Sequence, residues 1–282
     1  MSPCPGRDGL ARFYSCYGSS HRALTYTSQD ARRMLERISA RAPWDLRRDP
    51  RIAGLMKTGG LAGKKLLDVG CSTGEFLLAA RSLGAEPMGL DLDHGALRFV
   101  HDHLGIPVIQ GDAGQVDLPH AAFDVITCWD LVEHLIEPRA GILRLVKALR
   151  PGGRIAFWTP NADLIGKLGE DWMGFRVDLE HLQYFTAQTL GSLLDDQGVH
   201  AIHHEAIGFP TLARLENPQL GIVAAQGRLR ERLHQYRWLV TVADKLRAVK
   251  RGLPMSTVQG LECNHRGYHL FLIGSHSRSE QQ

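Results

Sequence analysis

One stretch of this sequence, Lys64–Leu77, constrains the fold more than any other. Leu66, Leu67 and Val69 form a short apolar run of the kind found in buried parallel strands. Two glycines interrupt this run, and helical spacing of apolar residues begins at Glu75. We therefore predict a strand, a tight glycine turn and a helix. The backbone N–H groups of such a turn and the positive end of the helix suit a negatively charged group, and glycines let a ligand approach closely.

The turn itself, residues 70–74, is compatible with three kinds of site. A dinucleotide fingerprint requires G-x-G-x-x-G, and Ser72 and Glu75 do not fit that pattern. The turn also matches the G-x-S-x-G nucleophile elbow of the α/β-hydrolases, in which Ser72 would be the nucleophile. Finally, it suits a ligand that carries a carboxylate and an ammonium group, because Asp68 at the end of the strand can meet the ammonium. The turn alone does not distinguish the last two possibilities.

Short apolar runs alternate with helical patterns along the rest of the chain. Further strands are expected at Pro87–Leu90, Val108–Gln110, Val125–Cys128, Arg154–Thr159, His200–Ile207 and Tyr268–Gly274. Capping residues mark several helix starts, among them Asp49, Asp93 and Thr186. This alternation predicts an α/β fold with a doubly wound, mostly parallel sheet of seven strands.

Composition restricts the partners and the cellular location expected for this chain. The chain has 282 residues, a net charge of +3 and five scattered cysteines without a C-x-x-C pair. The small net charge gives no support to nucleic-acid binding, and the cysteine pattern favours reduced thiols over disulfides or a zinc site. Residues 1–8 lack the apolar core of a signal peptide, and no apolar run is long enough to span a membrane. We therefore expect a cytoplasmic protein with no integral membrane segment and no nucleic-acid partner.

Acidic residues follow the predicted second and third strands. Asp91 lies about 20 residues after the glycine turn, the offset at which a carboxylate meets ribose hydroxyls in Rossmann-like nucleotide sites. We assign the ribose role to Asp91 and the role of helix cap to Asp93. Asp112 follows the third strand and can accept a hydrogen bond from an exocyclic amine such as that of adenine. Ligands lie across the carboxyl ends of the strands in sheets of this kind, so these side chains should share one edge.

Several motifs, taken in order, reveal a family resemblance. They are L-L-D-V-G-C-S-T-G, G-L-D, G-D-A, L-P-x-x-x-F-D, E-H-L and L-R-P-G-G, between Lys65 and about Ile207. Together they resemble the class I S-adenosylmethionine (SAM)-dependent methyltransferases, which have a Rossmann-like fold. The strings W-D-L-V-E-H-L, W-T-P-N and E-H-L-Q-Y-F are similar to the bacterial subgroup near the ubiquinone-biosynthesis O-methyltransferases and their relatives in glycan and natural-product pathways. Nothing upstream resembles the glycine-rich oxyanion segment of the hydrolases, which argues against Ser72 as a nucleophile.

The resemblance implies residues that contact the methionine end of SAM or of its product, S-adenosylhomocysteine (SAH). Asp68 and the carbonyl of Gly70 hold the methionyl amine, and Gly74 permits close approach. Cys128 and Trp129 lie beside the methionyl arm.

The resemblance also implies residues around the glycine loop and the adenosine. Asp91 takes the ribose diol, Leu92 packs on adenine, and Asp112 with the N–H of Ala113 reads the adenine edge. The loop residues Cys71 and Ser72 complete the predicted cofactor site. Ser72 is a departure, because most members have glycine at this position, and the serine should fit if its φ is negative.

Two histidines, His134 and His181, are the candidate catalytic residues. His134 follows the fourth strand and His181 lies in a loop after the fifth, so both should border the acceptor pocket. A hydroxyl attacks a methyl group poorly while its proton remains, and a neutral imidazole can remove that proton. We predict that His181 is the base, with Glu180 beside it to fix its tautomer. The alternative is a loop histidine that bonds only its own backbone.

In the ubiquinone relatives, an acidic-x-x-Glu-His string is associated with a divalent metal. Asp130, Glu133 and His134 match this string, and on a helix these positions would share one face. Asp130 replaces the more usual glutamate and has a shorter reach. We therefore favour a site without a metal.

The chain divides into four predicted parts. These are a helical N-terminal cap (1–60), a SAM-binding core (61–208), a helical insertion (209–262), and the last core strand with a tail (263–282). Within the insertion, residues 224–251 are rich in Lys and Arg at helical spacing. This helix suits a lid or a homodimer contact better than a membrane surface or an anionic substrate.

We therefore expect a SAM-dependent methyltransferase that acts on a small-molecule acceptor, at a hydroxyl group of a sugar, a phenol or another secondary metabolite. N- or C-methylation by the same fold is the alternative. A serine hydrolase that uses Ser72 and a SAM-binding scaffold without catalysis are more remote possibilities.

Overall fold

The computed structural model describes residues 27–169, 172, 181–207 and 269–277, together with Gly9 and Arg12. The chain forms two compact units. The first comprises residues 1–159, 180–204 and 271–282, and the second comprises residues 160–179 and 205–270. The predicted cap, residues 1–60, falls in the same unit as most of the predicted core. The predicted insertion, with its helix at 224–251, lies outside the described residues.

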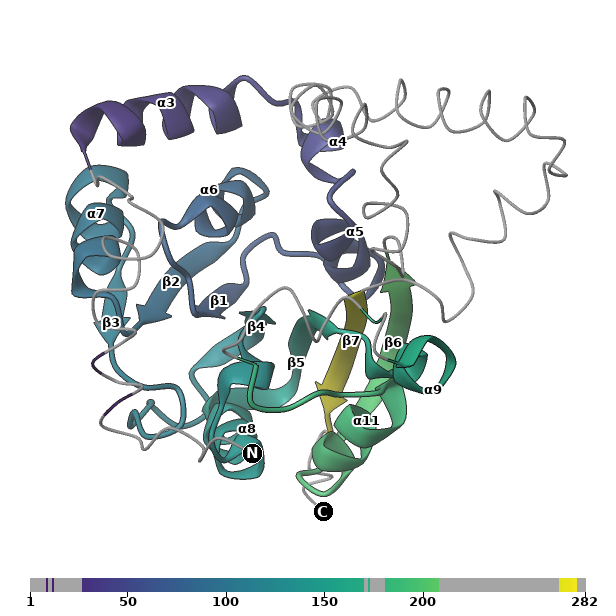
Figure 1. Cartoon of the computed structure of the whole chain (residues 1–282). Coiled ribbons are helices and arrows are strands. Elements are labelled where there is room, and N and C mark those ends of the chain that lie inside the picture. The colour runs from purple at the N-terminus through teal and green to yellow at the C-terminus, as the bar shows by residue number, and fades with distance from the viewer. Residues whose placement is uncertain are drawn as a thin grey trace, which may run out of the picture. The chain divides into compact units, whose positions relative to one another are not determined.

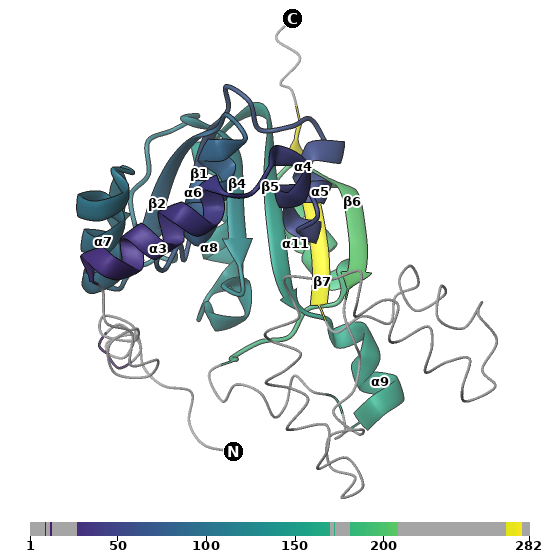
Figure 2. The ribbon, with the colours of Figure 1, turned by 90° about the horizontal axis from the view of Figure 1, so that it is seen from above.

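The core is one seven-stranded sheet of order β3-β2-β1-β4-β5-β7-β6 (Figure 1). The strands are β1 Lys65–Val69, β2 Glu86–Asp91, β3 Val108–Gln110, β4 Phe123–Trp129, β5 Leu149–Pro160, β6 Val199–Ile207 and β7 His269–His276. The strands β3, β2, β1, β4 and β5 pair in parallel, whereas β7 runs against its neighbours in Figures 1 and 2. The predicted α/β class and seven strands are confirmed. The order reverses between β1 and β4, which makes their carboxyl ends the switch point of the sheet.

Helices cover both faces of this sheet. The first unit contains α3 Ser28–Ser39, α4 Pro43–Leu46, α5 Pro50–Lys57, α6 Glu75–Ser82, α7 His94–Leu104, α8 Pro138–Ala148 and α11 Ala187–Asp195, whereas α9 Ile165–Leu168 belongs to the second unit. In the first unit, α5 and α6 lie over one face and α8 and α11 over the other (Figure 1). Helix α3 packs outside α6 and α7 as an additional layer.

Helix starts follow the predicted caps, because short polar side chains satisfy the first backbone N–H groups of each helix. Thr27 and Thr186 form capping boxes, and Asp49 accepts a hydrogen bond from the N–H of Arg51. The Asp93 carboxylate accepts from two backbone N–H groups of α7, so its predicted role as a cap is confirmed. The short helix α4 was not predicted from the sequence.

A buried arginine fixes the end of α5 against the sheet. Arg154 of β5 donates from Nη1 to the carbonyl of Leu55 and to Thr58 Oγ1, both at 2.9 Å, and from Nη2 to the carbonyl of Gly60. These bonds join the guanidinium to the last turn of α5 and to the loop that follows it. They also anchor the helix that carries Arg51 to the strand beside β4.

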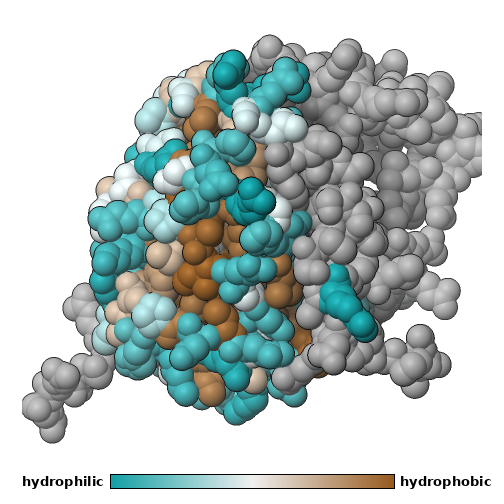
Figure 3. All heavy atoms as spheres, turned by 90° about the vertical axis from the view of Figure 1, so that its left-hand side faces the viewer, coloured by the Kyte–Doolittle hydropathy of each residue, from teal (hydrophilic) through white to brown (hydrophobic). Residues whose placement is uncertain are grey.

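The short strand β3 forms one edge of the sheet. Figure 3 shows the side of the molecule that lies on the left in Figure 1, where apolar residues form a band with hydrophilic residues on either flank. Val108 and Ile109 of the edge strand are half-buried, and three residues offer little backbone for pairing with another chain. Within the described part of the chain, no helix is both long enough and apolar enough to cross a membrane.

Candidate active site

The carboxyl ends of β1, β2 and β4 bring the predicted SAM-binding residues to one edge of the sheet. Asp68 is aligned with Gly89 of β2 on one side and with Thr127 of β4 on the other. Asp91 ends β2, and Trp129 ends β4. The predicted residues of the methionine and ribose ends therefore gather at the switch point, where ligands bind in open α/β sheets.

The glycine loop is held in place by its own backbone N–H groups. The N–H groups of Gly70 and Cys71 both donate to the carbonyl of Leu90, at 2.7 and 3.1 Å. The N–H of Ser72 donates to Asp91, and that of Gly74 donates to the carbonyl of Cys71. These four donors are satisfied within the protein, so the loop differs from the predicted anion cradle. Its carbonyls and its lack of side-chain bulk remain as its means of contacting a ligand.

Packing explains the two glycines and the cysteine of this loop. Gly70 and Gly74 have φ values of 76° and 75°, in the left-handed region that favours glycine. A Cβ on Gly74 would lie 2.9 Å from Val100 Cγ2, so this glycine also lets α6 approach α7. The Cys71 side chain fills the space beside Gly89 of β2, where an added Cβ would lie 2.6 Å from Cys71 Sγ. Burial raises the pKa of the Cys71 and Cys128 thiols well above the usual range, so both are packing groups rather than nucleophiles.

The condition of a negative φ at Ser72 is not met. Its φ is 47°, in the left-handed region, because the loop turns sharply so that the N–H of Ser72 reaches Asp91 Oδ2 at 2.7 Å. An L-residue pays about 1–2 kcal/mol for this conformation. The side chain is exposed, and within the described residues its hydroxyl bonds neither a histidine nor a carboxylate, as a hydrolase nucleophile would need.

Ser72→Gly tests both statements. The variant should leave methyl transfer intact and raise the free energy of unfolding by up to about 1 kcal/mol, because glycine adopts a positive φ without strain but loses more chain entropy on folding. Denaturant unfolding and a methyl-transfer assay measure the two effects. Loss of turnover in Ser72→Gly, or labelling of Ser72 by a fluorophosphonate probe, would instead support the hydrolase.

Asp68 is a buried carboxyl group at the centre of the site, with 2% of its surface exposed. Burial raises its pKa to about 7, opposed by a hydrogen bond from Thr127 Oγ1 at 2.6 Å and by the positive charge of Arg51. The negative charge of Asp91 adds a smaller upward contribution. A carboxyl group in this state gains most from a cation that arrives with the ligand.

Asp91 uses both carboxylate oxygens to organise the loop. Oδ2 accepts from the N–H of Ser72 at 2.7 Å, and Oδ1 accepts from the N–H of Asp93 at 2.9 Å. Burial raises the pKa of Asp91, and these two backbone hydrogen bonds oppose the rise. Each oxygen retains a second lone pair for a ligand hydroxyl.

The predicted adenine-binding residues lie on the loops after β2 and β3. Leu92 is half-buried and Ala113 is buried. Asp112 Oδ1 accepts from the N–H of Gly114 at 2.7 Å, which fixes the direction of this carboxylate within its turn.

Arg51 is a residue of this site that the sequence analysis missed. Its Nε and Nη2 bond both oxygens of Asp49, at 3.1 and 2.8 Å. Its guanidinium also lies over the rings of Phe76 and Trp129, 5.7 and 5.6 Å from the ring centroids, and the charge of Asp68 raises its pKa further. The sequence did contain an indication of this role. A cation in the first turn of a helix interacts unfavourably with the helix dipole, so its position there indicates a compensating interaction.

His134 and His181 form one cluster with Glu133. The two rings are in edge-to-face contact, with centroids 4.9 Å apart. His181 Nε2 lies 4.0 Å from Glu133 Oε1, and the two side chains are 4% and 0% exposed. Thr159 Oγ1 donates to the other Glu133 oxygen at 3.0 Å. The ring of Tyr184 also contacts His181 edge-to-face, with centroids 6.1 Å apart.

Backbone contacts hold the His181 loop against this cluster. The N–H groups of Leu182 and Gln183 both donate to the carbonyl of Glu133, and Gln183 Nε2 donates to the carbonyls of Leu135 and Ile136. Glu133 is thus the carboxylate beside His181 in the described residues, a pairing that the sequence analysis did not predict. The predicted partner Glu180 lies outside the described residues.

Asp130–His134 do not form the helix on which Asp130, Glu133 and His134 would share one face. Asp130 has a φ of 48° and is exposed, and only Val132–His134 form a 3₁₀ turn. The i, i+3, i+4 geometry that would join Asp130 to Glu133 and His134 is therefore wrong. Instead, ligand atoms of Glu133, His134 and His181 lie within 4.8 Å of one another. Two imidazoles and one carboxylate form a donor set that suits a divalent metal ion.

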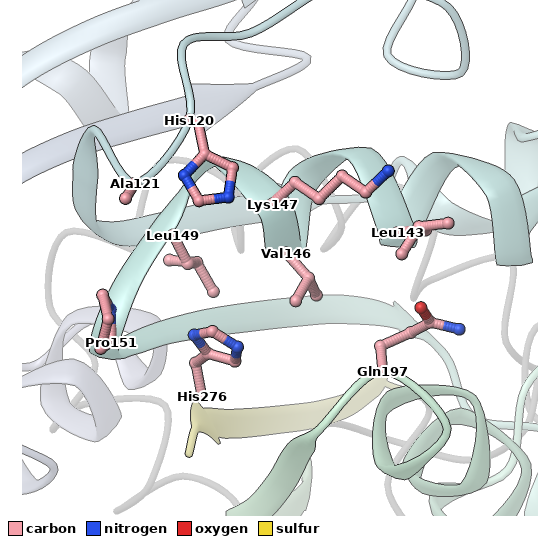
Figure 4. A pocket seen from close by; sticks show the side chains of 9 residues that line it. All are labelled: His120, Ala121, Leu143, Val146, Lys147, Leu149, Pro151, Gln197 and His276. Atoms are coloured by element: carbon pink, nitrogen blue, oxygen red, sulfur yellow. The ribbon is translucent and has the colours of Figure 1, made fainter. Parts of the chain in front are cut away.

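A separate pocket of about 240 Å³ lies at the opposite, amino edge of the sheet (Figure 4). The imidazoles of His120 and His276 come from opposite walls, with Val146 and Leu149 between them. Its other lining residues are Ala121, Leu143, Lys147, Pro151 and Gln197. It contains none of the predicted site residues.

Comparisons with known proteins agree with this arrangement. A family model described as a methyltransferase domain matches residues 26–204. The ubiquinone biosynthesis O-methyltransferases of Idiomarina loihiensis and Escherichia coli O9:H4 are 36% identical over 131 residues and 33% identical over 132 residues. These matches cover 44% and 45% of this chain and 52% and 53% of the relatives, so the chain spans about half the length of the curated relatives it matches.

Solved structures show the same fold. An S-adenosylmethionine-dependent methyltransferase from Mesorhizobium loti is 19% identical, with a TM-score of 0.51 over 84% of this chain and 99% of that chain. The phosphoethanolamine N-methyltransferase 2 of Haemonchus contortus, in complex with S-adenosyl-L-methionine, is 17% identical. Its TM-score is 0.54 over 93% of this chain and 60% of that chain.

Proposed function

Because the chain belongs to the methyltransferase domain family, we propose that it is an enzyme that transfers the methyl group of SAM to a hydroxyl group of a small-molecule acceptor. The observation that carries this proposal is the position of Asp68 and Asp91 around the glycine loop, at the switch point of the sheet. The choice of oxygen as the acceptor atom draws support from the ubiquinone biosynthesis O-methyltransferases among the relatives.

SAM supplies a methyl group on a positively charged sulfur. The protein therefore has to bind SAM and the acceptor, align them, and remove a proton from the acceptor. Asp68 pairs with the methionyl ammonium, and Arg51 lies beside it as the cation for the carboxylate. Asp91 accepts hydrogen bonds from the ribose diol through the lone pairs that the loop leaves free. Leu92 packs on the adenine, and Asp112 with Ala113 bonds its edge.

The histidine cluster activates the acceptor. With SAM bound, the acceptor oxygen would bond to the methyl carbon as the bond from that carbon to sulfur breaks and SAH leaves, while the hydroxyl proton passes to the imidazole of His181. The carboxylate of Glu133, 4.0 Å from His181 Nε2, stabilises the imidazolium that results. His134 holds the ring of His181 by edge contact. A divalent metal held by Glu133, His134 and His181 would instead act as a Lewis acid toward the hydroxyl.

The direct test is an assay of methyl transfer with full-length protein. Candidate acceptors with phenolic, sugar and aliphatic hydroxyls are incubated with methyl-labelled SAM, and products are analysed by mass spectrometry. We expect a gain of one labelled methyl at oxygen. Labelled product at nitrogen or carbon alone would overturn the O-methylation, and SAM binding without any product would favour a scaffold.

The raised pKa of Asp68 predicts opposite effects of pH on stability and on binding. A carboxyl whose folded pKa lies above its unfolded value favours folding at low pH, so stability falls from about pH 4 to pH 7. The expected loss is on the order of 4 kcal/mol, at 1.36 kcal/mol per pKa unit. SAM needs the ionised form, so its affinity should rise by about tenfold per pH unit below the pKa of about 7 and level off above it.

Asp68→Asn separates these effects. The variant keeps an acceptor for Thr127, should raise the melting temperature at pH 8, and should bind SAM weakly with little dependence on pH. Thermal unfolding and calorimetry measure both quantities. A pH-independent SAM affinity in the unmodified protein would contradict the role of Asp68.

A further inference from the structure

The pocket at the amino edge of the sheet is separate from the residues proposed to bind SAM and the acceptor (Figure 4). Its nine lining residues all belong to the first unit and come from the loop before β4, α8, the start of β5, the turn after α11 and the end of β7. Its volume of about 240 Å³ lies just below the range of about 300–1,000 Å³ typical of pockets for drug-sized ligands. The pocket therefore has room for a small organic molecule.

His276 offers a hydrogen-bond donor to this pocket. Its imidazole projects from the end of β7 toward Val146 and Leu149 (Figure 4). The Nδ1 atom is buried and has no hydrogen-bond partner within the described residues. A bare ring nitrogen tolerates this burial better than an N–H group, so the ring proton belongs on Nε2. Unlike Nδ1, the Nε2 atom remains accessible, and a ligand in the pocket can accept its hydrogen bond.

Three more polar side chains line the pocket, those of His120, Lys147 and Gln197. In the part of the chain that the structure describes, no hydrogen bond or ion pair occupies these side chains. The imidazoles of His120 and His276 come from opposite walls (Figure 4). Donors on both sides of the pocket can therefore reach one ligand group with several acceptor lone pairs.

Lys147 gives the pocket a positive charge, and no carboxylate is among the nine lining residues. Asp117, in the loop before β4, is exposed and does not line the pocket. Three other carboxylates close to the lining segments in sequence are paired with basic groups: Asp124 with Arg150, Asp195 with His200 and Asp196 with Arg139. The charge balance therefore favours an anionic ligand.

The loop that carries His120 is fixed against the end of α8. Ala121 has a φ of 49°, a left-handed conformation that is unfavourable for alanine. The N–H groups of Ala121 and Ala122 donate to the carbonyls of Lys147 and Ala148, at 3.0 and 2.9 Å. These bonds hold His120 at the pocket and occupy carbonyls that would otherwise repel an anion.

We propose that this pocket binds a small organic carboxylate with an apolar body. His120 and His276 donate hydrogen bonds to the carboxylate, and Lys147 supplies the opposite charge. The buried side chains of Val146 and Leu149 contact the apolar body. Because the pocket lies at the edge of the sheet opposite the SAM site, this ligand is neither the methyl donor nor the acceptor.

The experiment uses ¹⁹F NMR titrations of the full-length protein with 4-fluorobenzoate as the probe. We expect a Kd on the order of 1 mM, and 4-fluorobenzamide, which lacks the charge, should bind about 10-fold or more weakly. His276→Leu and Lys147→Gln should each weaken the binding of 4-fluorobenzoate by roughly 5- to 10-fold. His101→Ala, at an exposed imidazole of α7, is the control and should leave the affinity unchanged.

A second measurement needs no substitution in the folded core. The imidazole C–H signals of His120 and His276 should move when cyclohexanecarboxylate or phenylacetate is added, whereas that of His101 should not. Lys147→Gln lies at an exposed position and decides the question if His276→Leu fails to fold.

The outcomes test the site and the ligand class separately from the proposed function. Absence of binding of all three carboxylates up to about 20 mM, or binding that neither substitution weakens, would contradict the site. Equal affinity for 4-fluorobenzamide would exclude recognition of the charge, and displacement of 4-fluorobenzoate by an equal concentration of inorganic phosphate would exclude the contribution of the apolar wall. SAH binding in the same samples should be unaffected by either substitution, and its absence would contradict the methyl donor alone.

Discussion

Replacing His181 with alanine is expected to lower kcat by roughly 10²- to 10⁴-fold while SAM affinity stays unchanged. The loss is expected because His181 is the proposed base beside the buried carboxylate of Glu133. Without its imidazole, no group there accepts the proton of the acceptor hydroxyl. The hydrogen bonds that anchor the glycine loop join Ser72 and Asp93 to Asp91, so the SAM side of the site should be unaffected by the substitution. Single-turnover rates with labelled SAM, together with calorimetry, measure the two quantities.

The control is His101→Ala, which removes an exposed imidazole of α7 and should retain full activity. Assays with EDTA separate the base from a metal. If Glu133, His134 and His181 hold a metal, EDTA should abolish activity and a divalent ion should restore it. Full activity of His181→Ala in the presence of EDTA would exclude both kinds of activation and leave alignment as the source of catalysis.

Asp91→Ala is expected to weaken SAM binding by about 10²- to 10³-fold, since it removes a charged acceptor for two hydroxyls. It also removes the acceptor for the N–H groups of Ser72 and Asp93, so the glycine loop loses its anchor. Asp91→Asn should bind poorly too, because either orientation of the amide places its NH₂ against one of these N–H donors. Asp102→Ala, at an exposed carboxylate of α7, is the matched control.

Ligand variation separates the ribose contact from the loop. The unmodified protein should bind 2′-deoxy-SAH about 10-fold more weakly than SAH, whereas Asp91→Ala should bind the two equally. Calorimetric titrations of both proteins with both ligands give the coupling energy between the Asp91 side chain and the 2′-hydroxyl. Equal binding of both ligands by the unmodified protein would contradict the ribose role and leave Asp91 as a loop anchor.

The elements that local sequence determines were predictable. Asp93 and Thr186 cap helices because a short polar side chain there needs only the next three residues. The strand–turn–helix from Lys65 follows in the same way from an apolar run, two glycines and helical spacing. The prediction of a seven-stranded, mostly parallel sheet drew on family motifs as well as on alternation.

Features that depend on distant partners were not predictable. The left-handed Ser72 results from its bond to Asp91, 19 residues away. The approach of His181 to Glu133 depends on the backbone bonds from residues 182 and 183 to the Glu133 carbonyl. Arg51 reaches the site because Arg154 anchors α5 to β5. In each case the sequence shows the residue type, but the residue that it contacts depends on the tertiary fold.

The most direct test of this account is a calorimetric titration of SAH into the full-length protein at pH 8, where Asp68 is ionised. We predict saturable binding at one site per chain, about 10²- to 10³-fold weaker in Asp91→Ala and unchanged in Asp102→Ala. Absence of binding at SAH concentrations up to about 1 mM, the upper end of ordinary enzyme affinities, or unchanged binding in Asp91→Ala, would contradict the assignment of this edge of the sheet as the SAM site.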